Sequence, residues 1–139
     1  DWQAFRPLAD LPLGMTAHIV FAAIDPDRPA TQSPRVIAEV IRGAIGFQGL
    51  LLSDDLSMQA LSGPIEERAG LALAAGCDLA LHCNGDAAEV DAVLRVAPPL
   101  EPTGMARLQA LRPGPAAGEA LDDLVTTLAG LLEAEVGRA

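Results

Sequence analysis

The stretch G-L-L-L-S-D-D at residues 49–55 decides the fold of this chain. Its centre is an uninterrupted apolar run, and two acidic residues, Asp54 and Asp55, follow it directly. A strand that is apolar at every position is buried on both faces, as in parallel sheets that are covered by helices. We therefore expect residues 49–53 to form a parallel strand, with Asp54 at its carboxyl end.

Similar apolar runs on either side predict a repeated strand–helix unit. Residues 15–21 (M-T-A-H-I-V-F) and 77–82 (C-D-L-A-L-H) predict two further strands. The strand centres lie 33 and 29 residues apart, close to the roughly 31 residues that a (β/α)₈ barrel allots to each unit. A doubly wound sheet has units of similar length, so the spacing predicts an α/β fold and leaves both architectures open.

Helix signals separate these strands. Ser33, followed by proline, predicts the start of a helix, and Gly46 predicts its end. A second helix is expected between Pro64 and Gly76, and Asp86 is placed to cap a third over residues 87–96.

The last third of the chain has a different pattern. Prolines at 98 and 99 interrupt the strand–helix repeat, and Thr103 is a candidate cap for a short helix that reaches Arg112. From Glu119 onward, leucines recur at helical spacing. This stripe suits packing on the outside of a barrel or sheet, or alternatively a dimer seam, although it is too short for a coiled coil.

Composition excludes several classes of partner. The 139 residues carry a net charge of −10, with nine arginines and no lysine, and aromatic residues make up only 3%. An acidic chain repels a phosphate backbone or an anionic membrane, so we expect neither nucleic acid nor membrane as a partner. Its apolar runs are also far shorter than the roughly 18 residues of a membrane span.

The cysteines and the amino terminus indicate where the protein is located and whether it is part of a longer chain. Cys77 and Cys83, on one predicted strand, would lie about 20 Å apart, which is too far for a disulfide. Unbridged thiols and the lack of a signal-like segment favour a cytoplasmic protein. The chain begins at Asp1 rather than methionine, and we expect it to be part of a longer polypeptide.

Candidate chemical groups lie at the predicted strand ends, where parallel α/β folds place their reacting groups. They are His18, the pair Asp54 and Asp55, and His82 with Asn84. Each also has a structural interpretation: an aspartate before a helix is commonly a cap, and a rim histidine commonly bonds a backbone carbonyl. The acidic pair resembles a Mg²⁺ site as well, but the chain lacks the lysine and glycine-rich loop expected for phosphoryl transfer.

The motif S-D-D-L-S-M at residues 53–58, preceded by G-F-Q-G, resembles the nucleophile segment of family 3 glycoside hydrolases. It is most similar to the β-N-acetylhexosaminidases of bacterial cell-wall recycling. M-T-A-H at residues 15–18, I-D-P-D-R-P-A-T at 24–31 and A-G-C-D-L-A-L-H-C-N-G at 75–85 resemble later strands and loops of the same enzymes.

This resemblance implies the C-terminal part of a (β/α)₈ barrel, about strands six to eight, over residues 1–97. Residues 98–139 would form a C-terminal helical extension that packs on the barrel. It implies that Asp54 is the catalytic nucleophile, that Asp55 supports the motif structurally, and that His18 lines the substrate pocket.

The implied activity is retaining hydrolysis that releases terminal β-N-acetylglucosamine from muropeptides in peptidoglycan recycling, without a metal or other cofactor. In the family, an Asp–His acid/base dyad and further sugar-binding residues precede the region matched here. We therefore expect this chain to carry the nucleophile half of a site and to be inactive alone, with its oligomeric state open. Alternatives are another family 3 β-glycosidase, or a non-catalytic α/β fragment or metal-binding regulatory module.

Overall fold

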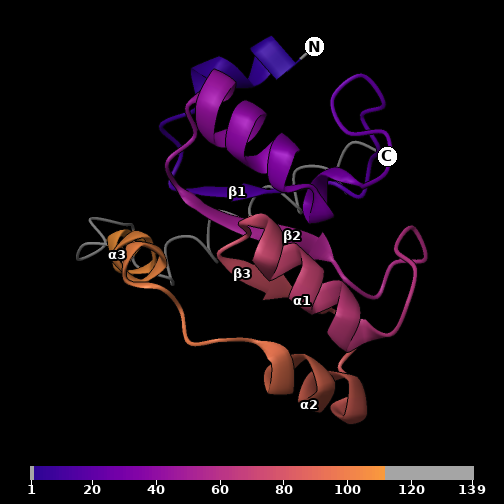
Figure 1. The fold of residues 1–139 in the computed structure, drawn as a ribbon. Coiled ribbons are helices and arrows are strands. Elements are labelled where there is room, and N and C mark those ends of the chain that lie inside the picture. The colour runs from indigo at the N-terminus through magenta and orange to yellow at the C-terminus, as the bar shows by residue number, and fades with distance from the viewer. Residues whose placement is uncertain (1, 112–139) are drawn as a thin grey trace, which may run out of the picture.

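The computed structural model describes residues 2–111, which form a parallel sheet and its connecting helices (Figure 1). The sheet has three strands in the order β1 (Leu13–Met15), β2 (Leu50–Asp55) and β3 (Leu79–Leu81). Leu13 pairs with Leu50, and Leu52 with Leu79. Because all neighbouring strands are parallel, the predicted α/β fold is confirmed, and the carboxyl ends of the strands lie along one edge of the sheet.

The helices follow the predicted positions closely. A π-helix, η3 (Val36–Ile45), connects β1 to β2, α1 (Ile65–Ala75) connects β2 to β3, and α2 (Ala87–Val96) follows β3. Shorter 3₁₀ segments are η1 (Trp2–Leu8) and η2 (Ala30–Gln32).

The caps expected at Ser33 and Asp86 are formed. The Ser33 hydroxyl accepts from the Val36 N–H at 3.1 Å, and the Asp86 carboxylate accepts from the first N–H groups of α2. Gly46 and Gly76 end their helices with φ of +85° and +114°, a left-handed backbone that favours glycine. These signals are local, which is why the sequence alone predicts them.

The first strand was predicted in the wrong place. β1 ends at Met15, whereas the apolar run predicted a strand over residues 15–21. The Thr16 N–H still donates to β2, but beyond it the backbone pairs with a loop, since the Ala30 N–H donates to the carbonyl of Ile19 at 2.8 Å. Consequently residue 18 lies beyond the strand rather than at its end.

The other two strands differ in length from the predictions. β2 extends through both aspartates, so Asp54 lies within the last residues of the strand and not after it. β3 is shorter than the predicted range 77–82, because Asp78 precedes the strand and turns its carboxylate to the Leu51 N–H at 2.8 Å.

A single apolar cluster joins the helices to the sheet. Leu51 of β2 belongs to this cluster together with side chains from η3, α1 and α2, and α1 contributes three buried alanines to it. These small side chains let α1 lie close to β3 and α2. The fully or nearly fully buried members include Ile37, Leu51, Leu56, Ala69 and Ala72.

The final described element, α3 (Pro102–Ala110), lies near the amino ends of β2 and β3 (Figure 1). Its helix begins at Pro102, with Glu101 at the cap position, so Thr103 is not the cap. The boundary predicted between residues 97 and 98 stays a prediction. Arg112 and the leucine stripe from Glu119 onward lie outside the described residues.

No helix within residues 2–111 has both the length and the apolar character needed to cross a bilayer.

Candidate active site at the carboxyl ends of the strands

Polar groups from all three strand ends meet at one edge of the sheet. His18 follows β1, Asp54 and Asp55 end β2, and Cys83 follows β3. The His18 Nε2 lies 2.9 Å from the Asp55 carbonyl oxygen, and the Cys83 N–H donates to the Asp55 carboxylate at 3.2 Å. The structure therefore brings the three strand ends together through one residue, Asp55.

Asp54 is half-buried at this edge. Its Oδ1 accepts a hydrogen bond from the Asp55 backbone N–H at 2.8 Å. Within the described chain this is the one hydrogen bond that the carboxylate accepts, so Oδ2 is left available to another group. A carboxylate that is held at one oxygen and open at the other is suited to nucleophilic attack.

The Asp55 side chain is engaged on both oxygens. Oδ2 accepts from the Ser57 hydroxyl at 2.6 Å, while Oδ1 accepts from the backbone N–H groups of Ser57 and Cys83. Desolvation raises the pKa of the Asp55 carboxyl, but the hydrogen bonds from Ser57 and Cys83 together outweigh it and hold that pKa below its ordinary value. Asp55 therefore ties the turn after β2 to the end of β3, as the predicted structural role requires.

His18 uses both ring nitrogens. Besides the Nε2 contact, its Nδ1 lies 2.8 Å from the Thr31 hydroxyl, which in turn lies 2.8 Å from the Thr16 hydroxyl. Both threonines are buried. Neither was singled out as functional from the sequence, although each lies in a motif that carries the family resemblance. A contact between residues 15 apart has no signature in a single sequence.

His82 and Asn84 do not join this cluster. The His82 side chain is only 6% exposed, and its Nε2 lies 3.3 Å from Glu89 of α2, so it faces the helix layer. Asn84 is exposed in the loop after β3. The His82 ring thus lies away from the candidate site, and within residues 2–111 it makes no hydrogen bond to a backbone carbonyl, so the expected structural role is not formed either.

The geometry disfavours a magnesium site at the acidic pair. Both Asp55 oxygens are occupied by protein donors. In the part of the chain that the structure describes, no three His, Cys, Asp or Glu side chains converge to form a metal-binding group.

The thiols are free, as the sequence predicts. Cys77 is buried, and burial raises the pKa of its thiol to about 12. Cys83 is exposed beside the acidic pair, and desolvation together with the charges of Asp55 and Asp54 raises the pKa of its thiol.

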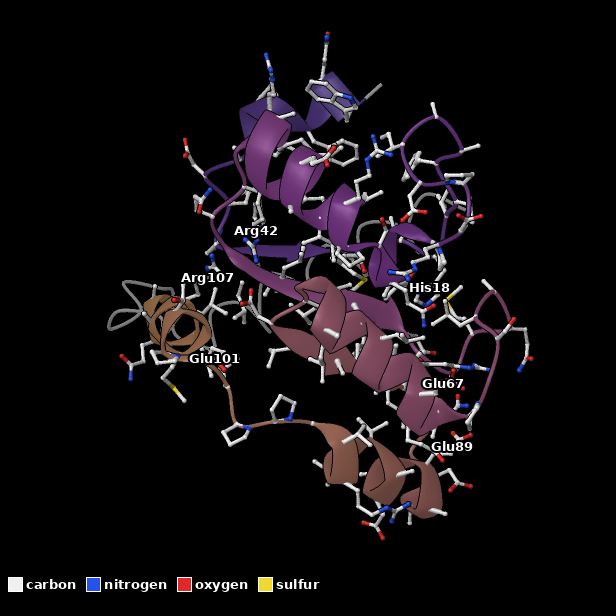
Figure 2. The ribbon with its side chains drawn as sticks, in the orientation of Figure 1. His18, Arg42, Glu67, Glu89, Glu101 and Arg107 are labelled. Atoms are coloured by element: carbon white, nitrogen blue, oxygen red, sulfur yellow. The ribbon has the colours of Figure 1, made fainter. Side chains whose placement is uncertain are left out.

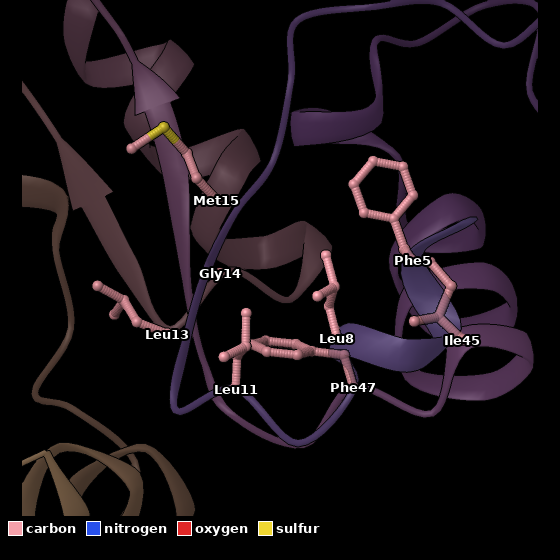
Figure 3. Close-up of a pocket in the computed structure, with 8 residues that line it drawn as sticks. All are labelled: Phe5, Leu8, Leu11, Leu13, Gly14, Met15, Ile45 and Phe47. Atoms are coloured by element: carbon pink, nitrogen blue, oxygen red, sulfur yellow. The ribbon is translucent and has the colours of Figure 1, made fainter. Parts of the chain in front are cut away.

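A separate hollow of about 220 Å³ lies beside β1 and the start of the chain (Figure 3). Apolar side chains line it, and several of them are about half exposed, including Phe5, Leu11, Leu13 and Met15. It contains none of the polar groups described above. We interpret it as an uncovered part of the sheet and its helices rather than as a site for chemistry.

Comparison with protein families identifies residues 1–111 as matching the glycosyl hydrolase family 3 N-terminal domain. The chain belongs to glycosyl hydrolase family 3. A β-hexosaminidase of Alkalilimnicola ehrlichii is 47% identical over 119 residues, which cover 83% of this chain and 34% of that protein. A β-hexosaminidase of Aromatoleum aromaticum is 40% identical over 107 residues, covering 76% of this chain and 30% of that protein.

Solved structures of the family have the same fold. A family 3 β-N-acetylglucosaminidase from a Paenibacillus species superposes with a TM-score of 0.65 at 32% identity, covering 84% of this chain and 26% of that one. A β-N-acetylhexosaminidase from Beutenbergia cavernae superposes with a TM-score of 0.54 at 34% identity, covering 78% and 31%. The family 3 chain described here spans about a third of the length of the curated relatives that it matches.

Proposed function

We propose that this chain is the C-terminal part of the catalytic barrel of a retaining β-N-acetylhexosaminidase, called the parent enzyme below. In this proposal β1, β2 and β3 are strands six to eight of the barrel, residues 1–97 complete that part, and residues 98–139 form a helical extension. The support is the family match, the parallel sheet and the names of the relatives.

In the proposed mechanism Asp54 is the nucleophile. A carboxylate oxygen of Asp54 attacks C1 of the terminal sugar, the bond to the leaving oxygen breaks, and an acid supplied by the rest of the barrel protonates that oxygen. The resulting glycosyl ester is then attacked at C1 by water, which gives its proton to the same group. The ester bond breaks, Asp54 is released as a carboxylate, and the sugar keeps its β configuration.

One observation carries this assignment. Asp54 is the penultimate residue of the central strand, at the edge where parallel barrels carry out their chemistry. Its Oδ1 accepts from the Asp55 N–H, and no donor within residues 2–111 binds Oδ2. Its neighbour cannot take the same role, because both Asp55 oxygens are bound by Ser57 and Cys83.

The proposed substrate is a muropeptide with a terminal β-linked N-acetylglucosamine, cleaved in the cytoplasm during peptidoglycan recycling. His18, beside Asp54 at the same edge, is proposed to lie in the wall of the sugar pocket. The chemistry uses the Asp54 carboxylate, the acid/base group of the rest of the barrel and water, and the proposal includes no metal or organic cofactor.

The test uses Asp54→Ala in the parent enzyme, with 4-nitrophenyl N-acetyl-β-D-glucosaminide as substrate. Loss of the nucleophile is expected to lower kcat by at least about 10³-fold, in keeping with the weight of covalent catalysis. Azide fits the space of the lost carboxylate, and it should restore part of the turnover and yield a glycosyl azide of inverted configuration.

Asp55→Asn serves as the matched control, since it keeps the size of the side chain next to the proposed nucleophile. It should not respond to azide. Ordinary turnover by Asp54→Ala would refute the assignment, and a preference for 4-nitrophenyl β-D-glucoside would favour another family 3 β-glycosidase.

A further inference from the structure

A chain of hydrogen bonds leads from two buried threonines, through the half-buried His18, to the residue beside the proposed nucleophile. We propose that His18 is a positioning residue for Asp54: Thr16 and Thr31 orient its ring, and the ring fixes the backbone of Asp55. This inference rests on the proposed function, because it assumes that Asp54 is the nucleophile.

The chemistry of each group determines which atom donates in these hydrogen bonds. The Asp55 carbonyl oxygen can only accept, so the His18 Nε2 must carry a hydrogen and donate to it at 2.9 Å. In the neutral ring Nδ1 is then an acceptor, and the Thr31 hydroxyl donates to it at 2.8 Å. Thr31 can in turn accept from the Thr16 hydroxyl at 2.8 Å.

The two threonines are shielded from water. Thr31 is fully buried and Thr16 is 5% exposed, so water does not replace a lost hydroxyl in this chain. Removal of the Thr31 hydroxyl would leave the His18 ring without the partner that sets its rotation, and the ring would no longer hold the Asp55 carbonyl in one orientation.

The backbone of Asp55 connects the His18 ring to the proposed nucleophile. The Asp55 carbonyl also accepts from the Met58 N–H at 3.1 Å, and the Asp55 N–H donates to Asp54 Oδ1 at 2.8 Å. Every polar group of Asp55 is thus bound. The backbone that carries the one donor to the Asp54 carboxylate within residues 2–111 is fixed, and His18 contacts it from the segment after β1.

This geometry separates two roles for His18. A histidine that recognises the sugar needs a ring nitrogen to bond a hydroxyl group, and both ring nitrogens already have protein partners. The ring edge can still line the pocket, but its polar atoms serve the protein. Loss of His18 should therefore slow the chemical steps more than it weakens substrate binding.

The experiment compares two pairs of variants in the parent enzyme. The side-chain nitrogen of His18→Gln can occupy the place of Nε2 and donate to Asp55, whereas His18→Asn reaches only as far as Nδ1. Thr31→Ser keeps the hydroxyl that orients the ring, and Thr31→Val replaces it with a methyl group of the same size. The members of each pair differ in the hydrogen bond and by one non-hydrogen atom in size.

We expect His18→Asn to lower kcat by about 10²-fold and Thr31→Val by about tenfold, since small displacements of a reacting group cost this much. His18→Gln and Thr31→Ser should recover most of the loss within their pairs, and KM for the 4-nitrophenyl substrate should change less than about threefold. Melting temperatures show whether each variant is folded. Mass spectrometry of the glycosyl-enzyme formed with a 5-fluoro N-acetylglucosaminyl fluoride gives the fraction of active sites that react. If His18→Asn does not fold, the Thr31 pair gives the same test.

The outcomes are distinct from those of the nucleophile test. Turnover retained by Asp54→Ala would overturn the proposed function and this inference together. An inactive Asp54→Ala, combined with unchanged kcat in His18→Asn or Thr31→Val, would overturn this inference alone. A rise in KM at constant kcat would also overturn it, because that result indicates direct contact between His18 and the sugar.

Discussion

Cys77 shows how the surroundings of one residue can determine a property of the whole chain. Its thiol is 5% exposed, packs in the apolar cluster and lies 3.8 Å from the carbonyl oxygen of Thr31. Burial penalises the thiolate and raises the pKa of Cys77 from 9.0 to about 12. The sequence has neither lysine nor tyrosine, so the two cysteines are its side chains that titrate in this range.

We predict that the free energy of unfolding of the 139-residue chain falls as the pH rises from 9 towards 12. The folded state keeps the Cys77 proton that the unfolded state releases, so the stabilisation is complete below the unfolded pKa and is lost above it. Urea unfolding at several pH values measures the slope of the free energy of unfolding against pH. It should flatten in Cys77→Ala and persist in Cys83→Ala, and an equal slope in both variants would contradict the prediction.

At the scale of elements, an arginine clasp joins α3 to the sheet. We use this name for Arg42, Asp78 and Arg107. Arg42 and Arg107 lie on the side of the sheet opposite His18 (Figure 2), and Asp78 directly precedes the amino end of β3. Asp78 binds Arg42 through Oδ2 and Arg107 through Oδ1, both at 2.8 Å, and Arg107 also donates to the carbonyl oxygen of Gln48. The side chains are 11% to 21% exposed, so the ion pairs are partly shielded from solvent.

We predict that Asp78→Asn lowers the free energy of unfolding by about 2–4 kcal/mol, because it leaves two partly buried arginines without their counter-charge. Arg107→Gln removes only the bonds that Arg107 of α3 makes to Asp78 and to the Gln48 carbonyl oxygen. It should lower the free energy of unfolding by about 1 kcal/mol.

Urea unfolding of the two variants gives this comparison. Arg35→Gln, which removes the exposed ion pair with Glu39 at the start of η3, is the control. If Asp78→Asn costs no more than the control, the clasp does not stabilise the sheet.

The sequence predicts elements that depend on local signals and misses those that depend on tertiary pairing. The cap at Ser33, the glycine at residue 46 and the central apolar run act on their immediate neighbours, and the corresponding helix and strand are present. The run at residues 15–21 is also mostly apolar, but its backbone bonds to Ala30 and Thr31, and no local pattern predicts that pairing.

The same distinction applies to the candidate site. The motif around Asp54 is continuous in sequence, so it could be found by reading along the chain. Thr31 and His18 are 13 residues apart, and His18 and Asp55 are 37 apart, so their hydrogen bonds become visible only in the folded structure. Single-sequence reasoning thus identifies His18 as a candidate but not the groups that it binds.

For the whole molecule, the edge of β1 is the feature with the largest consequence, because no strand within residues 2–111 pairs with β1 on the side away from β2. Leu13 and Met15 are 48% and 56% exposed there, beside the apolar hollow. Exposed strand edges of this kind pair readily with further strands. In the proposed barrel, the strands that precede β1 cover this edge and bring the acid/base group to Asp54.

We predict that the 139-residue chain alone does not hydrolyse 4-nitrophenyl N-acetyl-β-D-glucosaminide, because the acid/base half of the proposed site is absent. Co-expression with the preceding part of the Alkalilimnicola ehrlichii β-hexosaminidase should give a complex with measurable turnover. Met15→Asp places a charge on the β1 edge and should prevent that complex, as judged by co-purification. Hydrolysis by the chain alone would contradict the prediction.

The arginine clasp and the Asp54 edge lie at opposite ends of β2, a strand of roughly 17 Å. Sites this far apart, without shared partners, contribute almost independently to free energy. An engineer could therefore reinforce the clasp end for heat tolerance and redesign the opposite rim for new glycosides, and the two sets of changes should combine without mutual interference.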